Sequence, residues 1–150
     1  MFQQELGTLL DKTHRVEALI TPLAAALGML DAEATAAHAA RLSRADLASS
    51  TVMEMTALAG TMGRHYAQQE GLPPAVAEAI FESVLPRQAG DVLPSSPAGM
   101  LVSIADRLDS LVGLSAAGCA PTASADPYGL RRTAYGMLQV RTQQCSGCEG

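Results

Sequence analysis

The stretch SPAGMLVSIADRLDSLVGLSAAG, residues 96–118, decides the fold class of this chain. It opens with Ser96–Pro97, a helix-capping residue followed by a proline suited to the first helical position. Its large apolar residues recur at the three- and four-residue spacing of one helix face. These residues are Leu101, Ile104, Leu108, Leu111 and Val112. The stretch is therefore predicted to form a long helix that is apolar over much of its circumference.

The composition extends this prediction to the whole chain. Hydrophobic residues make up 48% of the 150 residues, but aromatic residues only 3%, and there is no tryptophan. The core must then consist of alanine, leucine, valine, isoleucine and methionine, of which alanine, leucine and methionine favour helices. A chain of this length is the size of one ordinary domain. We expect a single all-α domain.

Capping residues, prolines and glycines divide the chain into about six helices. Thr21–Pro22 is expected to start a short continuation of the first helix, Asp31 to cap the second, and Asp126–Pro127 to start the last. We expect helices at 2–20 with a continuation to 28, and at 31–43, 43–69, 73–85, 96–118 and from 126 onward. The helical domain is assigned to residues 1–140, and an irregular tail to residues 141–150.

The net charge of −5 argues against a free-standing nucleic-acid binder, which normally presents a basic surface. Lys12 is the only lysine, so the remaining nine cations are arginines. No apolar run approaches the roughly 20 residues that cross a bilayer. The first residues do not have the character of a signal or transit peptide, because Gln3, Gln4 and Glu5 interrupt them at once.

Two carboxylates lie three residues apart in the stretch quoted above, on one helix face. Asp106 and Asp109 could form a metal or acid–base pair, or a half-buried pair that accepts hydrogen bonds from an arginine or a helix N-terminus. His14, His38 and His65 supply no metal-binding spacing beside them. The structural interpretation is therefore favoured.

Two arginine pairs are the concentrated positive charge and the candidate RNA contacts. Arg41 and Arg44 are one helical turn apart and could grip a phosphate, although solvated or ion-paired arginines are the commoner case. Arg131 and Arg132 fall in the first turns of a predicted helix, whose N-terminus favours anions. One of these two is expected either to contact an RNA phosphate or to anchor the helix to a carboxylate, with Asp109 as the candidate.

Cys145 and Cys148 form a C-x-x-C motif near the end of the chain. Zinc sites normally use four ligands, and no second cysteine pair is present. No metal site is assigned to this motif.

Five ordered blocks carry a resemblance to a known family. They are FQQELGTLLDKTHRVEAL (2–19), TALAGTMGRHYA (56–67), LPRQAGDVLP (85–94), AGMLVSIADRLDSLVGL (98–114) and DPYGLRR (126–132). Together they resemble the beta subunit of bacterial-type glycyl-tRNA synthetase. The details are most similar to the fused alpha–beta enzyme of plant and algal chloroplasts and mitochondria. The resemblance covers roughly residues 2–140.

This resemblance implies a segment of glycine–tRNA ligase that scaffolds the enzyme and contacts tRNA(Gly) without catalysing the reaction itself. The alpha part, which is the implied protein partner, activates glycine with ATP and Mg²⁺. No cofactor is implied for this segment, and no membrane partner. The location implied is the chloroplast and/or mitochondrion, or the cytoplasm for a bacterial chain. The alternatives are a helical interaction module without a synthetase role and, less favoured, a metal-dependent phosphohydrolase of the HD type.

The resemblance also implies a helical domain related to the HD phosphohydrolase superfamily, whose metal ligands are a histidine, an adjacent His-Asp pair and a later aspartate. The pair corresponds to Ala45–Asp46, and the later aspartate to Asp106 or Asp109. No His-Asp dipeptide occurs anywhere in the chain, so this metal set is incomplete. Neither bound metal nor phosphohydrolase activity is expected.

Overall fold

The computed structural model describes residues 7–88, 90–118, 121–126 and 129–146. Within these ranges all regular secondary structure is helical, which confirms the all-α fold class. The seven α-helices are α1 (Leu9–Leu27), α2 (Glu33–Leu42), α3 (Ser50–Glu54), α4 (Thr61–Gln69), α5 (Pro74–Glu82), α6 (Pro97–Ala116) and α7 (Leu130–Ser146). Three short 3-10 helices are η2 (Leu30–Ala32), η3 (Ala45–Ala48) and η4 (Thr56–Leu58). None of the helices in these ranges is long and apolar enough to cross a membrane.

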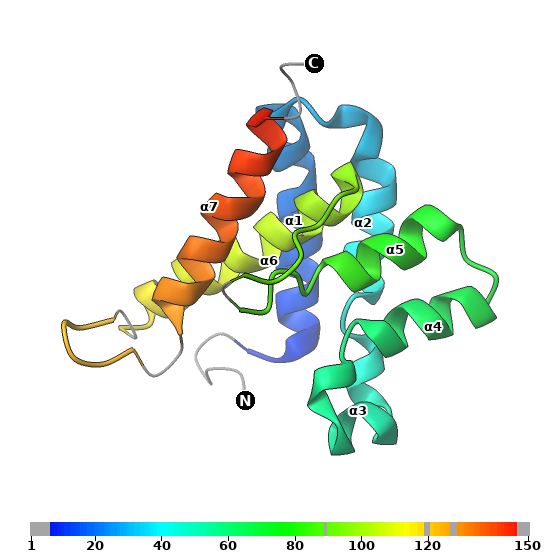
Figure 1. Ribbon diagram of the computed structural model, residues 1–150, viewed down its shortest axis with the longest axis horizontal. Coiled ribbons are helices and arrows are strands. Elements are labelled where there is room, and N and C mark those ends of the chain that lie inside the picture. Colours follow the sequence, from blue (N-terminus) through cyan, green and yellow to red (C-terminus); the bar gives the residue numbers. More distant parts are fainter. Residues whose placement is uncertain (1–6, 89, 119–120, 127–128, 147–150) are drawn as a thin grey trace.

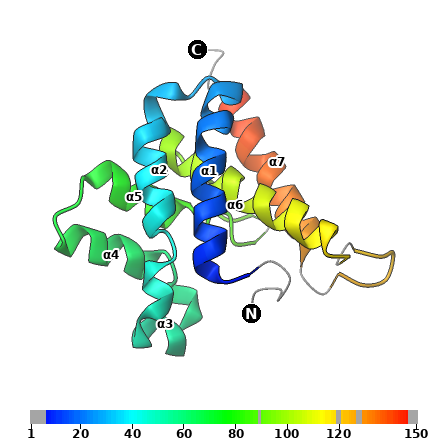
Figure 2. The same cartoon turned by 180° about the vertical axis from the view of Figure 1, so that it is seen from behind.

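Helix α6 is the centre of the fold and packs against α1, α2, α5 and α7. In Figure 1, α7 lies along one side of α6, and α1 lies behind α6. Figure 2 shows the opposite face, where α1 and α2 stand side by side in front of α6. The α6 helix begins as predicted, because Ser96 Oγ accepts a hydrogen bond from Gly99 N and Pro97 occupies the first turn.

The core between these helices contains many alanines. Val16, Ile20 and Ala24 of α1 follow one another at a spacing of four and are fully buried. They meet the alanines of α2 and the first half of α6, and small side chains of this kind let helix backbones approach closely. The alanines of α2 in this cluster are Ala36, Ala39 and Ala40.

The apolar stripe predicted along α6 is buried only in its first part. Leu101 and Ile104 are buried, but Val112 is 61% exposed. The second half of α6 extends past α5 and α2, so less of its circumference is covered (Figure 1). Apolar spacing identified the helix but did not show where its packing partners end.

The first helix continues through Pro22 instead of restarting there. Thr8 and Asp11 form a capping box at its start, and Gly28 ends it in the left-handed conformation. Pro22 removes one helical hydrogen bond, to the carbonyl of Ala18, which is an exposed residue. Burial of the apolar residues on both sides of Pro22 outweighs that loss. Thr21, expected to be a cap, donates its hydroxyl to Glu33 Oε1 at 2.7 Å.

The long helix expected at 43–69 is wrong, because this segment folds back on itself as η3, α3, η4 and α4. The buried carboxylate of Asp46 accepts hydrogen bonds from the backbone N–H groups of Gly60 and Gly63, at 2.7 and 3.1 Å. In one straight helix, residues 46 and 60 would lie about 21 Å apart. This tertiary contact bends the chain.

The two glycines of this segment have different roles. Gly60 precedes α4 with a φ of 81°, a left-handed conformation that favours glycine. Gly63 marks the expected close helix crossing, since an added Cβ would lie 2.8 Å from Ile80 Cγ2 on α5. A close crossing is thus confirmed for Gly63, whereas Gly60 is needed for the turn.

Other helix ends also differ from the sequence expectation. Asp31 lies within η2 and does not cap α2, which begins at Glu33. The side chain of Asp126 does cap the last helix, which begins four residues later at Leu130, and Pro127 lies outside the described residues. The tail expected to be irregular from residue 141 is helical as far as Ser146. The assignment of the domain to residues 1–140 stays a prediction.

Candidate functional site

Asp46, at the incomplete His-Asp position, has a structural role in this fold. Its side chain is 2% exposed, and its Oδ2 accepts both N–H groups at the start of α4. A carboxylate in this position satisfies donors that a helix N-terminus leaves unpaired and compensates its positive dipole end.

Asp106 and Asp109 belong to an ion cluster between α1 and α6. Lys12 Nζ lies 3.3 Å from Asp106 Oδ1 and 3.2 Å from Asp109 Oδ2. Arg15 Nε donates to Asp109 Oδ1 at 2.7 Å, and Arg44 donates to Asp106 Oδ1. These bonds confirm the structural interpretation of the two aspartates, with lysine as well as arginine partners.

The electrostatics of Asp109 reflect this pairing. Burial alone would raise its pKa, but the hydrogen bond from Arg15 and the charge of Lys12 outweigh that effect. The pKa of Asp109 therefore lies below its usual value, and the group is a carboxylate at neutral pH. Lys12 is itself only 3% exposed, so the pair is desolvated on both sides.

The histidines and cysteines do not assemble beside these aspartates. His14 and His65 are exposed, and His38 is half-buried. Cys145 is exposed and free, and Cys148 lies outside the described residues. In the described part of the chain, no group of three histidine, cysteine, aspartate or glutamate residues could hold a metal ion.

The first candidate arginine pair is divided between different partners. Arg41, in the last turn of α2, pairs with Glu17 of α1 and remains exposed. Arg44 lies beyond the end of α2 and pairs with Asp106 of α6. The two guanidinium groups are thus held by carboxylates on different helices. Whether either contacts tRNA stays a prediction.

The second pair, Arg131 and Arg132, lies in the opening turn of α7 as expected. The first N–H groups of this helix, however, already have a carboxylate as their acceptor. Asp126 accepts hydrogen bonds from the N–H groups of Leu130 and Arg131, both at 2.9 Å. The bond from Arg131 is the largest cause that lowers the pKa of Asp126. The Arg131 guanidinium donates to the carbonyl oxygen of Thr122. The suggested anchor, Asp109, pairs with Lys12 and Arg15, so that suggestion is wrong.

Arg132 differs from its neighbour. It is exposed, and the described part of the structure gives it no hydrogen bond or ion pair. It lines a cavity of about 340 Å³ between α6, the start of α7 and the segment after α5, which we term the arginine cavity. The charged side chains of its wall are Arg87, Arg107, Arg132 and Asp106, and its hydroxyl side chains are Ser83, Ser110 and Thr133.

The sequence interpretation missed Lys12, Arg15, Arg87 and Arg107. Lys12 precedes the buried residues at 16, 20 and 24 by the same spacing of four, which was a usable indication of burial. In the sequence, Arg107 lies between Asp106 and Asp109, and only those two aspartates were considered as candidate site residues. Its own burial depends on contacts with Pro86 and α7, which the local sequence does not show.

Comparison with known proteins decides the family. The family model described as "Glycyl-tRNA synthetase beta subunit" matches residues 1–147, nearly the whole chain. The chain belongs to the glycyl-tRNA synthetase beta-subunit family. Its relationship to the HD phosphohydrolase superfamily stays a prediction from resemblance.

Individual members of the glycyl-tRNA synthetase beta-subunit family agree with this assignment. The "Glycine--tRNA ligase, chloroplastic/mitochondrial 2" of Arabidopsis thaliana is 47% identical over 145 residues, 96% of this chain and 14% of that protein. The beta subunit of Clostridioides difficile is 49% identical over 140 residues, 93% of this chain and 20% of the relative. That of Chromohalobacter salexigens is 45% identical over the same shares. The chain thus spans a fifth or less of these relatives' length.

Proposed function

We propose that this chain is a helical domain of the beta region of glycine–tRNA ligase, which supports ligation of glycine to tRNA(Gly) by scaffolding the enzyme and contacting tRNA. The observation that carries the proposal is the family match over residues 1–147. The scaffolding role is supported by the Lys12–Asp109 ion pair, which joins α1 to the central helix α6.

The tRNA contact is supported by the distribution of charge. The chain as a whole carries a charge of −5, yet three of its nine arginines meet where α6, the start of α7 and the segment after α5 come together. Arg87, Arg107 and Arg132 line one cavity there, while the single carboxylate of its wall is already paired. A local excess of arginine suits the phosphate groups of RNA.

The partners and location follow from the same proposal. The alpha part of the synthetase would carry glycine activation, with ATP and Mg²⁺ bound there, and this domain would carry no cofactor of its own. The site of action would be the chloroplast or mitochondrion for a plant-type enzyme, and the cytoplasm for a bacterial one.

A segment exchange tests the proposal. Residues 1–147 replace the matching segment in the Clostridioides difficile beta subunit, and glycylation of tRNA(Gly) is measured after addition of the alpha subunit. At 49% identity the core positions should remain compatible. We expect glycylation within about tenfold of the unmodified enzyme.

A matched control exchange carries Asp109→Asn, which weakens the α1–α6 pair without changing side-chain size. If the unaltered exchange assembles with the alpha subunit but forms no glycyl-tRNA, the proposed function is wrong. Recovery of an unrelated protein in place of the alpha subunit would favour the alternative, a helical interaction module.

A further inference from the structure

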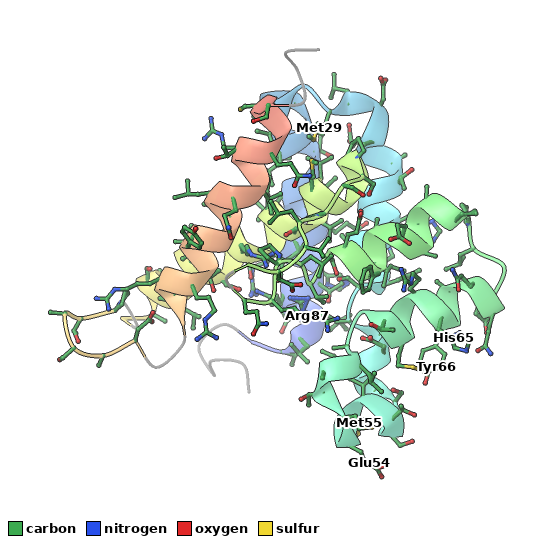
Figure 3. All side chains as sticks on the ribbon, in the orientation of Figure 1. Met29, Glu54, Met55, His65, Tyr66 and Arg87 are labelled. Carbon is green, nitrogen blue, oxygen red and sulfur yellow. The ribbon has the colours of Figure 1, made fainter. Side chains whose placement is uncertain are left out.

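We propose that the arginine cavity binds a phosphate group of an RNA backbone. This inference rests on the proposed tRNA contact and assigns that contact to a place. The cavity lies where α6, α7 and the segment after α5 meet, and Figure 3 labels one of its wall residues, Arg87, on that segment.

Arg107 supplies the main argument, because its guanidinium is buried and forms no direct ion pair among the described residues. The side chain is 8% exposed, and its donors reach only neutral oxygens: Ser103 O at 3.3 Å, Ser103 Oγ at 2.5 Å and Pro86 O at 2.6 Å. No carboxylate among the described residues lies within 4.0 Å of its guanidinium. A buried charge is costly unless it is paired, so an anion in the cavity would be favourable.

The burial of Arg107 also makes its charged form less favourable. Burial lowers the pKa of its guanidinium below the usual value, and the charge of Asp106 offsets this only in part. An arginine nevertheless remains protonated at neutral pH. The cavity wall therefore holds a permanent positive charge at Arg107, which Asp106 offsets only in part.

Asp106 does not cancel this charge, although it is part of the same wall. Its Oδ1 is paired with Lys12 at 3.3 Å and also accepts a hydrogen bond from Arg44. The close ion pairs of Asp106 are therefore formed with Lys12 and Arg44, which lie outside the wall, and not with the three wall arginines.

The remaining polar groups fit a phosphate oxygen. Arg132 is exposed at the wall and forms no hydrogen bond or close ion pair among the described residues, so its guanidinium can turn toward a ligand. Ser110 Oγ accepts a hydrogen bond from Lys12 Nζ at 2.6 Å, which leaves its hydroxyl hydrogen to donate. Arg87 is held beside the cavity by the carbonyls of Ala57 and Ala59, each at 2.9 Å.

A neighbouring feature favours an RNA chain over a lone anion. A second cavity of about 70 Å³ shares Pro86 and Arg132 with the first and is also lined by Tyr135 and Gln139. Arg132, Tyr135 and Gln139 lie three and four residues apart, on one face of α7. Tyr135 is 55% exposed and can stack on a base, and an amide can reach a sugar or base edge.

The test compares two neighbouring arginines of equal charge. Affinity of the chain for tRNA(Gly) is measured by fluorescence anisotropy over a potassium chloride series, for wild type, Arg132→Ala and Arg131→Ala. Arg131 is the control, because its guanidinium is held by the Thr122 carbonyl and does not line the cavity. Both residues are exposed, so both variants should melt at the wild-type temperature.

We expect Arg132→Ala to weaken binding about five- to tenfold and to reduce the slope of log affinity against log salt by about one. Arg131→Ala should weaken binding less than about twofold, as expected for a general loss of one surface charge. If wild type binds tRNA tightly and the two substitutions have equal effects, the assignment of the phosphate site to the arginine cavity is wrong, but the proposed tRNA contact is not. A wild-type chain that does not bind tRNA would overturn both.

A second arm separates RNA from free phosphate. Inorganic phosphate is titrated into the chain, and backbone amide shifts of α6 and α7 are followed by NMR. If the site binds an RNA backbone, the amide chemical shifts beside Arg107 and Arg132 should change without saturating below about 10 mM phosphate. One free phosphate ion makes too few contacts to bind tightly. Saturation at micromolar phosphate, with tRNA affinity unaffected by Arg132→Ala, would show a free-anion site instead.

Discussion

The ammonium of Lys12, the only lysine of the chain, lies 3.2 Å from the carboxylate of Asp109 across the α1–α6 interface. Both groups are buried, and Arg15 and Asp106 extend the pair to an ion cluster. Removing one member of a buried pair leaves the other desolvated without compensation. The aspartates of α6 are therefore better explained by fold stability than by metal chemistry.

Asp109→Asn should lower the free energy of unfolding by about 3 kcal/mol, because it removes the charge that Lys12 and Arg15 share. Urea unfolding followed by circular dichroism measures this. The control is Glu78→Gln, which breaks the more exposed Arg64–Glu78 pair and should cost less than about 1 kcal/mol. Equal losses in both variants would contradict a special role for the cluster.

The pH dependence of stability should change in the same variant. The pKa of Asp109 is lowered in the folded state, so the ionised group contributes full stability above its unfolded pKa, near 4. That contribution is lost as the pH falls from about 5 through the lowered folded pKa. Between about pH 5 and pH 2, wild type should lose more stability than Asp109→Asn. Parallel curves for the two proteins over this window would refute the assigned pairing.

Asp46→Ala should destabilise the fold by about 1–3 kcal/mol, since it leaves the buried N–H groups of Gly60 and Gly63 without an acceptor. Asp46→Asn keeps an acceptor oxygen and should lose less. Hydrogen exchange of the two glycine amides checks the local effect, and both should exchange faster in the alanine variant. Unchanged exchange would show that the Asp46 contact does not stabilise the start of α4.

Metal content is a separate prediction from the incomplete His-Asp set. Protein purified without a metal-affinity tag should contain well under one equivalent of any transition metal by elemental analysis. One full equivalent, lost on Asp46→Ala or Asp106→Ala, would revive the metal-dependent phosphohydrolase hypothesis.

The fold class could be predicted because it depends on local composition and spacing. Ser96–Pro97 starts α6 as expected, and Asp126 does cap α7, because capping is decided within a few residues. The break between residues 43 and 69 could not be predicted in this way. It depends on the hydrogen bond from Gly60 to Asp46, which joins residues 14 apart in the sequence.

The candidate site, like the fold, could be predicted from the sequence only in part. Asp106 and Asp109 were recognised as a pair on one helix face, but their cations come mainly from α1, more than 90 residues earlier in the chain. Arg131 and Arg132 looked equivalent in sequence. Only the folded structure distinguishes them, since the Thr122 carbonyl holds Arg131 whereas Arg132 lines the cavity.

The most direct test of the central claim is a kinetic comparison in the segment-exchanged synthetase. In the proposed function, this domain contributes to tRNA binding and not to glycine activation. The kcat/KM for tRNA(Gly) and the rate of glycine-dependent ATP–pyrophosphate exchange are measured for Arg132→Ala and Arg131→Ala. We expect a roughly five- to tenfold fall in kcat/KM for tRNA in Arg132→Ala alone, with pyrophosphate exchange unchanged in both variants. A fall in pyrophosphate exchange that matches the loss in kcat/KM, or no change in either quantity, would contradict this expectation.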